Sequence, residues 1–472
     1  MCHGSFVTAQ DADDLPASPT PTTQAASQPT TRPALTGPHA ASLTYQFLQR
    51  RIMTRQANVA EDLLGFHFII QDLVDYDNIK LALQAATKEP TPERYNELYA
   101  HFSRATPIPD VVLQYLDVAL ARDIERGLAT PDDAAQFYAW PAANGLTALV
   151  EAFDATQDVR FLELFIRTYD EILKARDSEH KRRDEVRDRV MKTWGYRHRE
   201  RWTCVMTHAG RIGYPVLRFC LAVDRADKKV RRQFNAKAQE YLNSIKTAIR
   251  EFDDDFRVIP GTNEGYYVRA SIGDVEPLNH MHAVGNSLVL LHVLTGKEEY
   301  KTRAEQLANY FRGSAERHDN GSLTWGLQPT PEQRTGHAPE LMWKGEVTIG
   351  FPVTGLRHSI GFTRDDLLPI VNTFMKNVWR GNGVINTSTS PGLDEELKLF
   401  DFTGWELRTA SFLGWVRLDS VDPRVREAVE QAMISRTDLY PQGWLQNTKT
   451  IEIYAYRMKP PAAAEQSGAA AK

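Results

Sequence analysis

The residues best suited to proton transfer lie in a short segment with helical spacing. Asn279, His282 and Asn286 fall three and four residues apart, so a helix would present them on one face. There a neutral His can take a proton, and an Asn amide can bind a carboxylate. An N-terminal cap by Asn279, beside ordinary hydrogen-bonded histidines, explains the same pattern. Asn279 and His280 are candidates for substrate binding. A zinc site is the weaker interpretation, because His280 and His282 point apart on a helix and a third ligand is not evident.

A second candidate group combines His208, Arg211 and Tyr214. These residue types suit β-elimination from a uronic acid, in which an Arg neutralises the C6 carboxylate and so acidifies the C5 proton. A His or Tyr then removes that proton, and a Tyr can protonate the leaving oxygen. Gly210 and Gly213 are expected to leave open space beside His208. The competing interpretation is that the arginine pairs with an acidic loop and that Tyr214 belongs to the core.

Glu346 is a further candidate for a general acid or base, with Arg357 on the same predicted helix as a substrate-binding residue. We expect Glu346 to open this helix. A Glu in a first turn also simply complements the helix dipole, and this is the competing interpretation. The sequence lacks a Gly-rich phosphate loop, a Gly-x-Ser-x-Gly elbow and a His-Glu-x-x-His motif. It therefore predicts neither a cofactor nor a metal.

Loop segments supply a group of aromatic residues that suits sugars. Aromatic rings stack on the apolar C–H faces of sugars, while polar groups pair with the hydroxyls. The competing interpretation is that each ring packs beneath a loop, but we expect at least two to line a binding site. The candidates for substrate binding in these loops are Glu264, Tyr266, Tyr267, Trp325 and Trp343.

Pairs of helices must position these residues. Apolar residues at helical spacing predict five pairs, whose first helices start 58 to 72 residues apart. A period this regular indicates a repeat architecture. The predicted pairs are 142–153 with 157–175, 207–223 with 227–251, 279–294 with 297–314, 346–360 with 363–380, and 404–417 with 422–436.

Other patterns support the repeat. Residues 212–216 (IGYPV) and 349–353 (IGFPV) have nearly the same sequence. A proline inside a helix costs about 3 kcal/mol, so its presence in both segments predicts a kink that the two helices share. Segments 252–278 and 315–345 are expected to be loops with short β-hairpins, which would lie together at one end of a ring of helix pairs. The charged segment 176–201 is expected to be a solvated helix face.

Five pairs, and a sixth from helices between 78 and 127, would close a ring. This pattern resembles the (α/α)6 toroid of carbohydrate-active enzymes: polysaccharide lyases, unsaturated glucuronyl hydrolases and glucuronyl epimerases. The resemblance covers about residues 75–440 and rests on the repeat, on Thr295-Gly296 with the following Tyr300, and on the aromatic-rich loops. It carries no signature of one family. It implies an all-α fold and an enzyme that degrades or modifies an acidic, uronic-acid-containing polysaccharide or oligosaccharide.

Within that resemblance the residues favour β-elimination. The candidates for proton transfer are His208, Tyr214 and His282. The candidates for binding the carboxylate are Arg211 and Asn279. A glycoside hydrolase on the same fold is the first alternative, with Glu346 or Glu264 as the acid, and it would need two carboxylates flanking one cavity. The sequence is also compatible with a non-catalytic glycan-binding or scaffold protein, and with an open solenoid that binds proteins.

Composition narrows the class of protein. The 472 residues are 42% hydrophobic, carry a net charge of -5 and give a pI near 6.3. The chain therefore lacks the excess of basic residues that is typical of a nucleic-acid-binding protein. A run of about 18 apolar residues, which a membrane-spanning helix needs, is also missing. Cys2, Cys204 and Cys220 fit neither a disulfide framework nor a zinc spacing, and the last two are expected to be buried thiols.

The ends of the chain differ in composition from its middle. Residues 1–42 are rich in Thr and Pro and are expected to be disordered, as are residues 461–472. Residues 43–460 are expected to form one toroid domain. Residues 1–42 are interpreted first as a plain flexible N-terminus. The alternative is a tether, because Cys2 ahead of the Thr/Pro-rich spacer resembles a bacterial lipoprotein whose signal has been removed. Since a tethered or exported location fits a polysaccharide substrate, a periplasmic, secreted or lipid-tethered location is expected rather than a cytoplasmic one.

Overall fold

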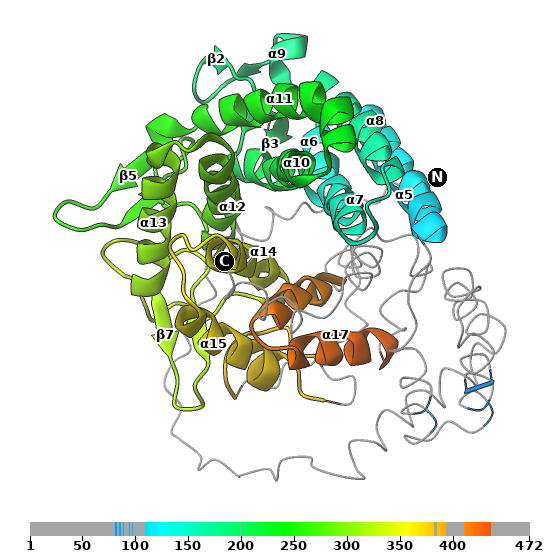
Figure 1. Cartoon of the computed structure of the whole chain (residues 1–472). Helices are drawn as coiled ribbons and strands as arrows, with labels where there is room; N and C mark the ends of the chain where they lie inside the picture. The colour runs from blue at the N-terminus through cyan, green and yellow to red at the C-terminus, as the bar shows by residue number, and fades with distance from the viewer. Residues whose placement is uncertain are drawn as a thin grey trace.

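Helices dominate the structure, and they form an inner and an outer layer around a common axis (Figure 1). The computed structural model describes residues 109–198, 200–381, 385–392 and 410–435, and a few single positions between 81 and 97. The inner elements are α7 (Ala143–Thr156), α10 (Met206–Arg225), α12 (Leu278–Thr295), α14 (Met342–Arg357) and the 3-10 helix η4 (Ala410–Ser420). The outer elements are α8 (Arg160–Lys174), α11 (Lys228–Arg250), α13 (Glu298–Gly313), α15 (Arg364–Asn372) with the π-helical η3 (Thr373–Val378), and α17 (Arg424–Ser435).

Each inner element packs on the next around the ring. Helix α10 contacts both α7 and α12, α12 contacts α14, and α14 contacts η4. The predicted all-α toroid is confirmed, and all five predicted pairs are present. Helix α5 (Pro109–Ala129) belongs to the predicted sixth pair and packs on α7 and α8, while the other residues of that pair lie largely outside the described part.

The turns within the pairs follow the sequence signals. Gly296 ends α12 with φ +67°, a left-handed conformation that glycine adopts without strain, and its N–H bonds the carbonyl of His292 at 2.7 Å. The Asp227 carboxylate caps the start of α11, and Thr363 forms a capping box at the start of α15. These caps stop one helix and start the next, which keeps the two helices of a pair antiparallel.

Short antiparallel hairpins lie between an outer helix and the next inner helix. The predicted loop segments contain β5 (Phe256–Val258) with β6 (Gly265–Tyr267), after the 3-10 turn η2 (Asp253–Asp255), and β7 (Ala315–Arg317) with β8 (Leu323–Trp325). Since each hairpin leads into the N-terminus of an inner helix, the described hairpins belong to one end of the ring. We call this the hairpin end.

The prediction of a solvated helix at 176–201 is wrong. This segment holds the short helix α9 (Asp177–His180) and the hairpins β1 (Arg183–Asp184) with β2 (Arg189–Val190) and β3 (Gly195–His198) with β4 (Arg201–Cys204). Many of its charged residues are exposed, but they do not lie on one helix face. Others are partly or fully buried: the Asp184 carboxylate accepts from the N–H groups of Val186 and Arg187, and Arg187 also pairs with Asp255. Charge pattern alone did not show these partners.

Helices α10 and α12 approach closely at a glycine. A Cβ on Gly210 would lie 2.6 Å from the backbone of Ala283 and Val284, and a Cβ on Gly213 would meet the Ser287 hydroxyl. The space that we expected beside His208 is therefore filled by α12, which corrects the sequence interpretation. Pro215 lies inside α10 and Pro352 inside α14, and both helices continue past them.

Replacing Gly210 by Ala should destabilise the protein by about 1–3 kcal/mol, because the new methyl overlaps backbone that cannot rotate away. Gly213→Ala, one turn further along α10, is the matched control. Its methyl would lie 2.8 Å from the Ser287 hydroxyl and 3.1 Å from Ile245 Cγ2, and these side-chain atoms can shift more easily than backbone, so it should cost less. Urea unfolding of both variants measures the difference, and a Gly210→Ala midpoint that is no lower than the Gly213→Ala midpoint would contradict this prediction.

The two described cysteines, Cys204 and Cys220, are free buried thiols, as predicted. Cys2 and the segments 1–42 and 461–472 lie outside the described residues, so the tether and the domain limits stay predictions.

Candidate active site

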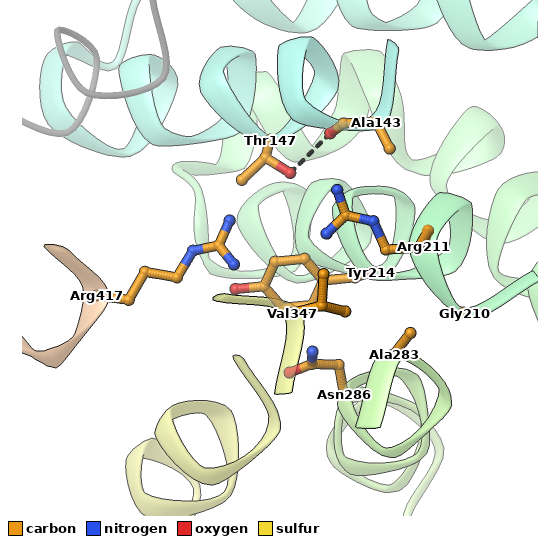
Figure 2. A pocket seen from close by; sticks show the side chains of 9 residues that line it. All are labelled: Ala143, Thr147, Gly210, Arg211, Tyr214, Ala283, Asn286, Val347 and Arg417. Carbon is orange, nitrogen blue, oxygen red and sulfur yellow. Dashed lines mark hydrogen bonds between the residues drawn. The ribbon is translucent and has the colours of Figure 1, made fainter. Parts of the chain in front are cut away.

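A narrow pocket lies where the inner elements converge on the axis of the ring (Figure 2). Residues from α7, α10, α12, α14 and η4 line it, so the first and last described inner elements border the same space. The space holds about one water molecule, which suits a small polar group rather than a whole sugar ring. The lining residues are Ala143, Thr147, Gly210, Arg211, Tyr214, Ala283, Asn286, Val347 and Arg417.

Tyr214 is the titratable phenol of this pocket. Figure 2 shows its ring between the guanidinium groups of Arg211 and Arg417. The Tyr214 hydroxyl accepts a hydrogen bond from Arg218 Nη1 at 3.2 Å, and the Arg417 guanidinium lies 5.8 Å from the ring centroid. Burial raises the pKa of Tyr214, but the charges of Arg218, Arg417 and Arg357 outweigh it and hold this pKa below the ordinary value of 10. The phenolate form is therefore more accessible than in an ordinary tyrosine.

Arg218 is itself held by two carboxylates from α7. Its Nη1 donates to Glu151 at 2.8 Å and its Nη2 donates to Asp154 at 2.8 Å. Arg218 and Glu151 are both buried. Charge-assisted bonds of this kind fix the guanidinium in place, and the Tyr214 hydroxyl thereby gains a fixed donor.

Arg211 and Arg417 bring two cations to the pocket wall. Arg211 donates to the Ala139 carbonyl at 3.2 Å and to Asn144 Oδ1 at 2.8 Å, and its guanidinium lies 4.9 Å from the Trp140 ring centroid. Arg417 lies 3.8 Å from the Glu346 carboxylate. Guanidinium groups match the planar, bidentate geometry of a carboxylate, so these two residues suit an acidic ligand.

Asn286 completes the polar lining. Its side chain is buried, and its carboxamide oxygen has no hydrogen-bond partner among the residues that the structure describes. A buried amide left unsatisfied costs about 1–3 kcal/mol, so a ligand or water is expected to bond it. The sequence placed Asn286 on the polar face of its helix but did not select it. Arg417 was missed as well, because only the closure of the ring brings η4 to this pocket.

The predicted histidines lie away from the pocket lining. His208 packs its ring on Tyr196, and burial lowers its pKa to about 3. His282 bonds the Thr348 carbonyl at 2.7 Å through Nδ1 and packs against the rings of Phe311 and Phe351, and burial lowers its pKa to about 4. Both rings are neutral at pH 7, so their roles in proton transfer stay predictions.

These buried histidines predict acid sensitivity. A His with a folded pKa near 4 and an unfolded pKa near 6.5 binds its proton more readily in the unfolded chain. The free energy of unfolding should therefore fall as the pH drops from about 6.5 towards 4, by up to about 1.4 kcal/mol per pH unit for each such group. His282→Gln should remove the contribution of one group from this slope, up to about 1.4 kcal/mol per pH unit. Denaturant titrations at several pH values measure the slope. An unchanged slope would contradict the lowered pKa of His282 in the folded protein.

Asn279 and His280 lie in the first turn of α12. The His280 ring bonds the Glu276 carboxylate at 2.9 Å, and Arg269 lies 3.6 Å from the same carboxylate. This buried group ties the start of α12 to the preceding loop, and His280 does not line the pocket. The Asn279 carboxamide oxygen is buried and lacks a hydrogen-bond partner within the described ranges.

Glu346 does not open its helix, which corrects the sequence prediction: α14 begins four residues earlier, at Met342. The Glu346 side chain is buried against Gly414 of η4 and lies behind Arg417, next to the pocket rather than in its lining. Arg357 lies exposed at the other end of α14, ten residues and about 15 Å beyond Val347. Its charge reaches Tyr214, but its side chain does not line the pocket.

Most of the predicted aromatic residues pack beneath the hairpins. Tyr267 is fully buried, and Trp325 is buried with its Nε1–H bonded to Glu340 at 2.5 Å. Tyr266 stacks on Tyr310, with ring centroids 5.3 Å apart. Trp343 remains partly exposed in the first turn of α14.

Glu264 does not line the pocket either, and it forms an ion pair with Arg334, beside the Tyr310 ring. Within the described ranges, no cluster of three His, Cys, Asp or Glu side chains is placed to hold a metal ion. No helix in the same part of the chain is long and apolar enough to cross a membrane.

No protein-family model matches the chain, and no curated protein matches it. Two similar solved structures are inactive variants of the α-1,6-mannanase GH76A of Salegentibacter sp. HEL1_6, in complex with α-1,6-mannotetrose and α-1,6-mannotriose. They share 10% and 9% sequence identity, cover 67% and 68% of this chain and 88% and 89% of theirs, and both give a TM-score of 0.43. A likeness this weak says nothing about the reaction of this chain.

Proposed function

We propose that the protein is a carbohydrate-active enzyme that cleaves a uronic-acid-containing polysaccharide by β-elimination. The observation that carries this proposal is the composition of the axial pocket. A phenol with a lowered pKa lies there between two arginines, beside a buried asparagine with a vacant acceptor. No carboxylate side chain is among the described lining residues. A cationic pocket with a base fits a uronate better than a neutral sugar.

The size of the pocket suits the uronate carboxylate alone. A site with room for about one water can take two carboxylate oxygens if the side chains move slightly, whereas the sugar ring must stay nearer the hairpin end. Arg211 then donates to the C6 carboxylate and stabilises the negative charge that develops on it when C5 loses its proton. The unsatisfied Asn286 Oδ1 is an acceptor, so it accepts a hydrogen bond from a water or a sugar hydroxyl.

Tyr214 carries the proton transfer in this mechanism. As phenolate it takes the C5 proton, and the C5–H electrons form a double bond between C4 and C5. The bond between C4 and the glycosidic oxygen breaks, and that oxygen takes a proton from the newly protonated Tyr214. The products are one chain with a 4,5-unsaturated uronate end and one chain with a free hydroxyl. Atoms and charge balance without any added reagent.

Hydrolysis is the second candidate, and Glu346 is the observation that favours it. Its buried carboxylate lies next to the pocket behind Arg417. Glycoside hydrolysis generally uses a pair of carboxylates on either side of the bond. The described lining supplies no such pair, so elimination is the better supported reaction.

Ultraviolet absorbance tests the proposal, because elimination creates a conjugated C=C–COO⁻ group and hydrolysis does not. The full chain would be incubated with alginate, polygalacturonate, hyaluronan and glucuronan. We expect absorbance to rise with at least one of these polymers. New reducing ends without new absorbance would indicate a hydrolase, and binding without either product would indicate a non-catalytic glycan-binding protein.

A further inference from the structure

The inner helices arrange the axis of the ring in layers. On α10, Thr207 precedes Arg211 and Tyr214 by four and seven residues, so all three share one face of the helix. On α12, Asn279 precedes Ala283 and Asn286 by the same intervals. Since the later residues of each series line the pocket, Thr207 and Asn279 lie one turn above it, on the side of the hairpin end.

Both residues of this upper layer have unsatisfied polar atoms. Thr207 Oγ1 and Asn279 Oδ1 are buried, and neither has a hydrogen-bond partner in the described part of the chain. Their residues are 2% and 3% exposed. Together with Asn286 Oδ1, two turns after Asn279 on α12, they give three unsatisfied polar atoms on the pocket-facing sides of α10 and α12, which we call the polar column. Each is costly unless a water or a ligand hydroxyl bonds it.

Tryptophans occupy the same layer on the two flanking elements. Trp140, in the π-helical turn η1 (Tyr138–Ala142) that leads into α7, lies under the Arg211 guanidinium at 4.9 Å and is partly exposed. Trp343 precedes the pocket residue Val347 by four residues on α14 and is also partly exposed. Indole rings offer the apolar faces on which sugar rings stack.

We infer that Trp140, Thr207, Asn279 and Trp343 form a sugar-binding subsite one helical turn above the pocket, which binds the rings of the sugar chain on the hairpin side of the pocket through stacking and hydroxyl hydrogen bonds. The inference deepens the proposed function and rests on it in one respect: the pocket holds the carboxylate of one sugar of an oligosaccharide. The enzyme should accordingly prefer longer oligomers to a single sugar.

Calorimetric binding tests the subsite, with Tyr214→Phe as the background so that substrate is not consumed. The ligands are oligogalacturonates and alginate oligomers from dimer to pentamer, and xylo-oligosaccharides of the same lengths as a neutral series. Affinity should increase with length, and Thr207→Val and Asn279→Leu should each reduce that increase about tenfold, since each removes one hydrogen bond to a sugar hydroxyl.

Thr193→Val is the matched control. Thr193 is a fully buried threonine whose hydroxyl also lacks a partner among the described residues, but it lies between β2 and β3, away from the column. It should leave the length dependence unchanged. If Thr207→Val behaves like Thr193→Val, the subsite is overturned and Thr207 is a structural residue.

The neutral series separates this inference from the proposed function. Length-dependent binding of xylo-oligosaccharides that Thr207→Val weakens, with no binding of the uronate oligomers, would support the subsite while contradicting the uronate proposal. Binding of uronate oligomers that does not depend on length would overturn the subsite and leave the uronate proposal standing. Failure of every oligomer in both series to bind would overturn both.

Discussion

Tyr214→Phe is expected to reduce kcat by about 10²- to 10⁴-fold, which is the usual contribution of a positioned general acid or base. The substitution keeps the ring between Arg211 and Arg417 and removes only the hydroxyl that Arg218 bonds. KM should change little, because the carboxylate contacts remain. Steady-state kinetics on whichever uronate polymer gives product would measure both quantities.

Tyr169→Phe provides the control for Tyr214→Phe. Tyr169 is a buried tyrosine of the outer helix α8, and its hydroxyl lies 3.4 Å from Ser244. Its loss should leave kcat unchanged. The pH profile is a second check: the rate should rise with pH as Tyr214 loses its proton, with a pKa below 10 because of the nearby arginines. Full activity in Tyr214→Phe would remove Tyr214 from the mechanism.

Arg218→Met should destabilise the fold by about 3–5 kcal/mol, the usual cost of removing one partner of a buried ion pair. The Glu151 carboxylate, 2.8 Å from Arg218 and buried with it, would lose the guanidinium that compensates its charge. Chemical denaturation measures the loss. Arg167→Ala breaks the exposed ion pair with Asp117 on the outside of the ring and should cost at most about 1 kcal/mol.

A double variant separates the effect of Arg218 on the stability of the fold from its effect on the pKa of Tyr214. Arg218→Met combined with Glu151→Gln removes both charges and should recover part of the lost free energy. In both variants the pKa of Tyr214 should rise, because the cation that lowers it most is gone. Tyrosinate absorbance, with Tyr214→Phe as the blank, would show this shift. An unchanged pKa would mean that Arg218 holds the fold but does not tune the phenol.

The sequence predicted the helical pairs well because their signals are local. Apolar spacing marked the inner helix 278–295, and Gly296 and Thr363 marked turns through their own conformational preferences. The charged segment 176–201 was misread as a helix, because its hairpins depend on partners distant in sequence, such as Asp255, which pairs with Arg187. Local patterns predict elements, whereas the pairing of charges depends on the closed ring.

The pocket was only partly predictable for the same reason. Arg211 and Tyr214 were selected from residue type and spacing, and both line the pocket. Helical spacing could not tell which polar residue faces the axis and which faces a neighbouring helix, so His282 was selected and Asn286 was not. Arg417 comes from an element about 200 residues later in the chain, and no local pattern connects it to Tyr214.

The mass of the products tests the central claim most directly. A uronate oligomer cleaved by elimination gives fragments whose masses sum to that of the substrate, with one fragment lighter by one water than its hydrolytic counterpart. We expect this unsaturated fragment from the wild-type chain and its loss in Tyr214→Phe. Fragments that have gained a water, with Tyr214→Phe still active and Glu346→Gln inactive, would contradict the account.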